Sequence, residues 1–124
     1  MVLDASAVLA LLNAEPGWER VSEALPSAVM SAVNLSEVVG KLVDHGLPAD
    51  EIRALLSGLG LTIVAFDQEA AVGSGALRAI KGARRLSLGD RACLHLARSR
   101  SMPALTADRY WSQIDAGVEV VVIR

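Results

Sequence analysis

The sequence predicts an α/β fold, in which a central and mostly parallel sheet has helices on both faces. Short apolar runs alternate along the chain with segments of helical composition, an order typical of parallel sheets. Several of these runs are almost continuously apolar, as in strands that are covered on both sides. The chain has 124 residues, of which 52% are hydrophobic. That size and composition favour one ordinary domain, residues 1–124, with a sizeable core.

Local signals then give the elements in chain order. The apolar runs predict strands at residues 2–3, 28–30, 61–66, 104–106 and 118–123. The segments between them predict helices at residues 5–12, 18–25, 34–45, 48–56, 68–80 and 88–100. Pro26 and Gly46 stand where helices should end, and Pro48 stands where one should begin. The run at 61–66 is partly β-branched, so we expect it to be a buried strand.

The charges are divided unevenly along the chain, although the net charge is only −2. The first 77 residues carry ten acids and three bases, and the remainder carries nine bases and four acids. Such asymmetry is typical of a protein that binds an anionic partner, or of one with a basic rim beside an acidic pocket. An ordinary solvated helix face also produces it. No apolar run reaches the ~18 residues of a membrane helix, and we expect neither a signal peptide nor a membrane segment. The single cysteine, Cys93, argues against a disulfide scaffold and suits a reducing cytoplasm.

Four acidic residues occupy equivalent positions in this predicted fold. Asp4 directly follows one predicted strand and Asp108 comes two residues after another, whereas Glu37 and Asp90 each come three residues after a predicted helix cap. The two predicted caps are Asn34 and Ser87. Taken singly, each acid could be a helix cap or a first-turn residue. Sites in such sheets form beyond the carboxyl ends of the strands, and four carboxylates gathered there would repel one another unless a divalent cation neutralised them. Ligation by oxygen alone favours Mg²⁺ or Mn²⁺ over zinc.

These residues, in this order, resemble the PIN-domain family. The resemblance rests on VLDAS at 2–6, NLSE at 34–37, LSLGDRACL at 86–94, LTAD at 105–108 and Trp111. It is most similar to the VapC-type toxins of prokaryotic toxin–antitoxin pairs, and it spans almost the whole chain. The resemblance implies a three-layer α/β/α fold and a metal-dependent endoribonuclease that inhibits translation and growth. It also implies a VapB-type antitoxin as partner, and a homodimer.

The same resemblance assigns roles to individual residues. The acids that would hold Mg²⁺ or Mn²⁺ are Asp4, Glu37, Asp90 and Asp108. Ser6 and Thr106 match positions that support the first acid and the metal, and Asn34 matches a polar position that orients the pocket. The basic segment, residues 78–100, would then meet RNA phosphates. Its candidate contacts are Arg78, Lys81, Arg84, Arg85 and Arg91. An aromatic content of 3% argues against extensive base stacking. Apolar helices between residues 33 and 61 would be buried in a homodimer or against an antitoxin.

Two alternatives stay open at this stage. A PIN nuclease that processes RNA without being a toxin would carry the same residues. A non-enzymatic, receiver-like module could instead bind Mg²⁺ for regulation. Such a module would have paired acids after its first strand and a lysine after a late strand, whereas here Asp4 stands alone and no lysine accompanies Asp108.

Overall fold

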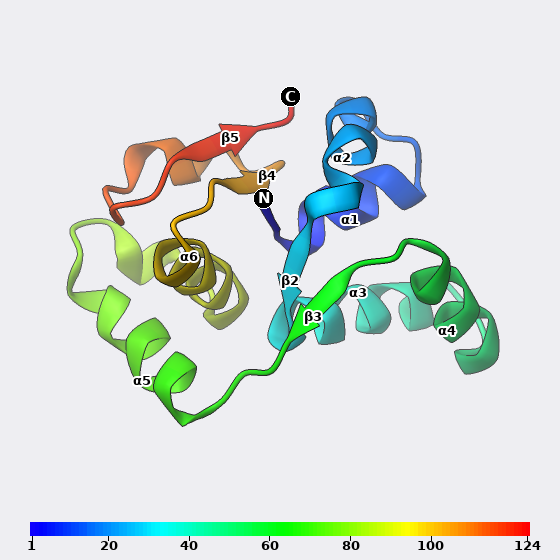
Figure 1. Ribbon diagram of the computed structural model, residues 1–124, viewed down its shortest axis with the longest axis horizontal. Coiled ribbons are helices and arrows are strands. Elements are labelled where there is room, and N and C mark those ends of the chain that lie inside the picture. Colours follow the sequence, from blue (N-terminus) through cyan, green and yellow to red (C-terminus); the bar gives the residue numbers. More distant parts are fainter.

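The computed structural model describes residues 1–124, and its centre is a five-stranded sheet (Figure 1). The strands are β1 (Val2–Leu3), β2 (Val29–Ser31), β3 (Thr62–Val64), β4 (Ala104–Thr106) and β5 (Val120–Val122). They lie in the order β3-β2-β1-β4-β5, and every neighbouring pair is parallel. Because all strands run in one direction, the carboxyl ends of β1, β2 and β4 meet at the same edge of the sheet.

Helices cover both faces of the sheet, which confirms the predicted three-layer α/β/α class. The helices are α1 (Ala5–Leu12), α2 (Trp18–Ala24), α3 (Ala32–Asp44), α4 (Ala49–Gly58), α5 (Gln68–Ala76) and α6 (Leu88–Arg100). Leu3 and Met30 face the core shared with α1, α3 and α4, whereas Val2 and Val29 face the core shared with α6 and Trp111. None of the helices combines the length and the apolar character needed to cross a membrane.

Several predicted elements have the limits that the sequence indicated, and others do not. The strands at 2–3 and 104–106 and the helices at 5–12 and 88–100 are confirmed. The predicted buried strand at 61–66 is wrong in extent and in burial, because β3 is short and Thr62 and Ile63 are exposed. β3 pairs only with β2 and therefore forms an edge of the sheet. The predicted helix at 68–80 also ends early, with a 3₁₀ turn at Leu77–Ala79 after α5.

The start of α3 corrects one predicted cap. Ser31 caps this helix, because its Oγ accepts a hydrogen bond of 3.2 Å from the Val33 amide. Strand β2 passes directly into α3, so Asn34 lies inside the first turn and is only 1% exposed. The second predicted cap is confirmed, since Ser87 and Asp90 form a reciprocal capping box at the start of α6. The structure thus leaves the Asn34 side chain free to make contacts outside its own helix.

Candidate active site

Asp4 is the most constrained acid of the chain. It follows β1, caps α1 and is 4% exposed. Its Oδ1 accepts from the Ala7 amide at 2.8 Å, and its Oδ2 accepts from Thr106 Oγ1 at 2.7 Å. The Ser6 hydroxyl also donates to this carboxylate, at 2.8 and 2.9 Å from its two oxygens. These donors come from the beginning of α1 and the end of β4, so the carboxylate is fixed where the two elements meet.

Ser6 and Thr106 also tie this carboxylate to the loop after β4. Ser6 Oγ accepts from the Ala107 amide at 2.9 Å, and Thr106 Oγ1 accepts from the Asp108 amide at 3.0 Å. Each hydroxyl donates its one proton to Asp4 and accepts a hydrogen bond from a backbone amide on one of its two lone pairs. The pair therefore sets the position of the loop that carries Asp108 relative to Asp4.

Glu37 and Asp90 are brought together by the contact between α3 and α6. Asp90 Oδ2 accepts from the Ser87 amide at 2.9 Å, which fixes one oxygen in the capping box. Asn34 Nδ2 donates to Glu37 Oε2 at 3.1 Å within α3, and to the Gly89 carbonyl at 3.0 Å across the contact with α6. Because both of these partners are acceptors, the amide of Asn34 must direct its nitrogen toward them. Asn34 thus bridges α3 and α6 and orients Glu37.

Gly89 permits this close approach of the two helices. A Cβ at Gly89 would stand 2.0 Å from Glu37 Oε1 and 2.5 Å from its Oε2, so any side chain there would displace the carboxylate. Gly89 was not predicted as a site residue from the sequence. The available signal was a glycine inside the first turn of a capped helix, where it costs helix stability without a local reason.

All four predicted acids line one open pocket at the carboxyl edge of the sheet. The pocket has a volume of about 440 Å³ and is also lined by Ser6. Asp108 lies at its exposed rim, and its Oδ1 accepts from the Tyr110 amide at 2.9 Å. Further lining residues that the sequence analysis did not select are Ala5, Leu9, Gly40, Lys41 and Asp44. Acids that are distant in sequence therefore share one cavity.

The acids influence one another electrostatically. Burial raises the pKa of Asp4 from 3.8 to about 6, although hydrogen bonds from Thr106, Ala7 and Ser6 act against this shift. The nearby charge of Asp90 adds to it. Partial desolvation likewise raises the pKa of Glu37, and repulsion from Asp90 contributes. The pKa of Asp90 is itself raised by desolvation and, to a smaller extent, by repulsion from Asp108. Asp90 is thus the acid that couples to the other three.

The chemistry of this pocket fits a hard divalent cation. Its ligand atoms are carboxylate and hydroxyl oxygens, and an ion there would offset both the desolvation and the smaller mutual repulsion that raise the pKa values of these acids. As the side chains stand, no group of three His, Cys, Asp or Glu residues is arranged to hold a metal ion. Mg²⁺ needs no such group, since it usually keeps several waters and takes only one or two carboxylates.

One predicted RNA contact is wrong. Arg91 is only 9% exposed, and its Nη1 donates to the carbonyl of Ser74 in α5 at 3.0 Å. It follows Asp90 in α6, and this single step along the helix turns its side chain from the pocket toward α5. Arg91 therefore ties two helices together and is not accessible to a phosphate.

The other predicted basic residues are exposed. They are Arg78, Lys81, Arg84 and Arg85. The Arg85 guanidinium lies over the ring of Tyr110, 4.3 Å from its centroid, and the Tyr110 hydroxyl donates to the Gly82 carbonyl at 3.0 Å. Because the Tyr110 amide also bonds Asp108, the basic segment is attached to the rim of the acidic pocket on its β4 side.

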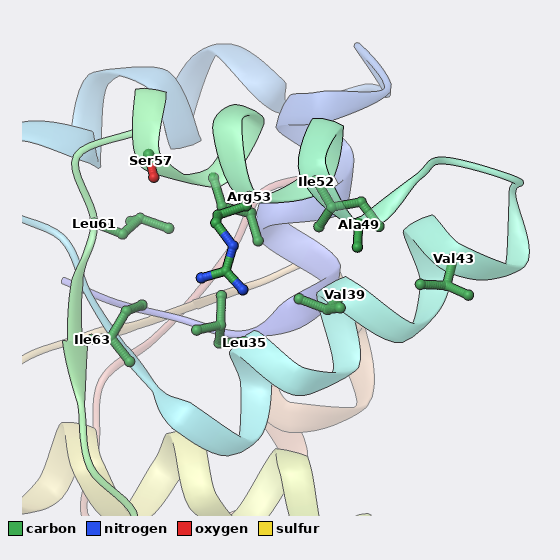
Figure 2. Close-up of a pocket in the computed structure, with 10 residues that line it drawn as sticks. Leu35, Val39, Val43, Ala49, Ile52, Arg53, Ser57, Leu61 and Ile63 are labelled. Atoms are coloured by element: carbon green, nitrogen blue, oxygen red, sulfur yellow. The ribbon is translucent and has the colours of Figure 1, made fainter.

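A second, apolar cavity lies between α3, α4 and β3 (Figure 2). It has a volume of about 480 Å³, and eight of its ten lining residues are hydrophobic. Figure 2 shows Arg53 extending from α4 across this groove toward α3, with Leu35 and Val39 beside it. Val43 and Ile63, which also line the groove, are 54% and 40% exposed.

The sheet order and the four acids at its carboxyl edge define a class of protein. Residues 1–117 match the PIN domain, and the chain belongs to the PIN-domain family. PIN domains are nucleases. No curated protein matches the sequence.

Several solved structures are similar to this chain over nearly its full length. A toxin–antitoxin complex from Klebsiella pneumoniae is similar at a TM-score of 0.74 and 23% identity, over 99% of this chain and 97% of that one. DNA-bound VapBC from Salmonella typhimurium gives 0.74 and 21%, with the same coverage. VapBC-5 from Mycobacterium tuberculosis, a member of the VapBC toxin–antitoxin family, gives 0.60 and 25%, over 99% of this chain and 96% of that one. The shared fold thus extends over the whole length of these relatives.

Proposed function

We propose that the protein is a metal-dependent endoribonuclease that acts as the toxin of a VapBC-type pair. The observation that carries this proposal is the gathering of Asp4, Glu37, Asp90 and Asp108 around one pocket of about 440 Å³. The structural relatives are described as toxin–antitoxin complexes, which supports the toxin role. Cleavage of RNA in the cytoplasm would inhibit translation and growth.

In this proposal Asp4, Glu37 and Asp90 would hold the ion directly or through water, and Asp108 would help to hold a second ion or a water molecule. Bound Mg²⁺ or Mn²⁺ would supply an activated water and neutralise charge on the phosphate. The hydroxyls of Ser6 and Thr106 hold the Asp4 oxygens in place, and Asn34 holds Glu37. Exposed bases on the β4 side, including Arg85, attract the RNA backbone that the acids alone would repel.

Cleavage of purified RNA tests this function. The protein should cut RNA in the presence of Mg²⁺ or Mn²⁺ and stop when EDTA is added. Asp4→Asn should be folded and inactive, and a conservative change far from the pocket, Arg98→Lys on α6, should cut normally. Cutting that continues in EDTA, or an active Asp4→Asn variant, would reject the proposed site.

Growth separates a toxin from a PIN nuclease of RNA processing. Induction in cells should arrest growth, and co-expression of an antitoxin encoded by a neighbouring gene should relieve the arrest. Sequencing of RNA 5′ ends shortly after induction would identify the RNA that is cut. A nuclease that leaves growth unaffected would favour the processing role.

We further propose that the apolar groove between α3 and α4 receives the antitoxin. A partner segment with apolar side chains and one acid would bury the groove and pair with Arg53. Val43→Asp, in the groove, should weaken rescue by the antitoxin. Leu55→Asp is a matched control, because Leu55 is an exposed residue of α4 that does not line the groove. Equal loss of rescue in both variants would argue against this site.

We also expect a homodimer. Exposed apolar side chains outside the groove, such as Val72 at 66% exposure, favour contact with a second copy. Light scattering coupled to size exclusion measures the mass directly, and a purely monomeric protein would contradict this expectation.

A further inference from the structure

The acidic pocket extends away from the sheet edge, as a channel between α1 and α3. Glu37, Gly40 and Asp44 line it from α3, and Ser6 and Leu9 line it from α1. From Glu37 to Asp44 the α3 axis rises by about 10 Å. A Cβ at Gly40 would have no heavy atom within 4 Å, so the channel is open above this residue.

Lys41 is the only base among the residues that line this channel. It lies one helical turn after Glu37 and three residues before Asp44, on the same side of α3. Its ammonium group forms no ion pair, since the one salt bridge of the chain joins Arg124 and Glu15. Lys41 thus offers a free, exposed positive charge between two acids.

The sheet order places Lys41 on the opposite side of the acids from the basic segment. Strand β1, which carries Asp4, lies between β2 and β4. β2 leads into α3 and Lys41, whereas β4 leads to Asp108 and, through Tyr110, to Arg85. A strand of RNA that crosses the carboxyl edge of the sheet therefore meets a base before the acids and another base after them.

We propose that Lys41 contacts an RNA phosphate next to the scissile bond, on the α3 side of the acids. This inference rests on the proposed nuclease function and names a positioning residue of its site. Lys41 is about 6 Å along the helix axis from Glu37, comparable to the spacing of consecutive phosphates in an RNA strand. Without this charge the phosphate would face Glu37 and Asp44 alone.

Labelled single-stranded RNA tests the proposal. Lys41→Met keeps the aliphatic stem and removes the charge, so KM for the single strand should rise about tenfold, with kcat nearly unchanged. In a non-cleaving Asp90→Asn background, fluorescence anisotropy should show a similar loss of affinity, with a salt dependence flatter by about 0.7 in the log–log slope. Lys41→Arg should restore most of the affinity.

Arg98→Met, which removes a base at the far end of α6 from Asp90, should leave KM and affinity unchanged. Wild-type cleavage with unchanged KM, affinity and salt slope in Lys41→Met would overturn the role of Lys41. A wild-type protein that does not cut this RNA with Mg²⁺ or Mn²⁺ would instead refute the proposed function.

Discussion

A methyl group at Gly89 should disable the site without unfolding the protein. In Gly89→Ala the new Cβ would stand 2.0 Å from Glu37 Oε1, and ordinary contact begins at 3.4 Å, so the carboxylate must withdraw by about 1.4 Å. The atoms that move are the far end of a flexible side chain, which keeps the cost in stability small. Alanine is favoured over glycine in helices by up to about 1 kcal/mol. A displacement of about 1 Å can cost about 10²-fold in rate, so kcat/KM should fall by about that factor.

Two measurements on the same preparations check this prediction. Urea denaturation should give an unfolding free energy equal to or slightly above that of the wild type, and RNA cleavage should give the reduced kcat/KM. Gly75→Ala is a matched control, because a Cβ there has nothing within 4 Å. It should leave cleavage unchanged. Adding Glu37→Asp, which shortens the acid, should cost less in the Gly89→Ala protein than in the wild type. Wild-type kcat/KM in Gly89→Ala would refute the claim that the α3–α6 approach positions Glu37.

Three further predictions concern charge. The pKa of Asp4 is about 6 in the folded protein against an ordinary 3.8, so its contribution to stability is complete below about pH 4 and is lost as the pH rises through 6. In EDTA, the unfolding free energy of Asp4→Asn relative to that of the wild type should therefore rise by about 3 kcal/mol as the pH is raised from below 4 to above 6. If urea titrations give the same difference between the two proteins at every pH, the prediction is contradicted. Asp90→Asn should lower kcat/KM by at least about 10²-fold, since Asp90 couples to the other acids; near-normal cleavage would remove it from the site. Replacing Arg84 and Arg85 by alanine should weaken RNA binding and flatten its salt dependence, and an unchanged slope would exclude both from the interface.

Contacts within a few residues of sequence were sufficient to predict several parts of the site. The Ser87–Asp90 capping box joins neighbours in the chain, so the limits of α6 followed from local hydrogen bonding. The apolar runs that form β1 and β4 end immediately before Asp4 and before the turn with Asp108, which indicated that both acids follow strands. The oxygen-only chemistry of the acids was equally a property of the residues themselves.

Which side chains meet was decided by the tertiary structure. Asn34 satisfied a cap pattern, yet Ser31 caps the helix and Asn34 joins α3 to α6. Arg91 carries the same charge as the other residues predicted to contact RNA, yet packing against α5 buries it. The run at 61–66 has the composition of a buried strand, but the sheet order leaves β3 at an edge. Local hydrogen bonds are encoded by residues a few positions apart. The burial of a side chain and the neighbours toward which it points depend instead on how distant segments pack together. No spacing in the sequence specifies that packing.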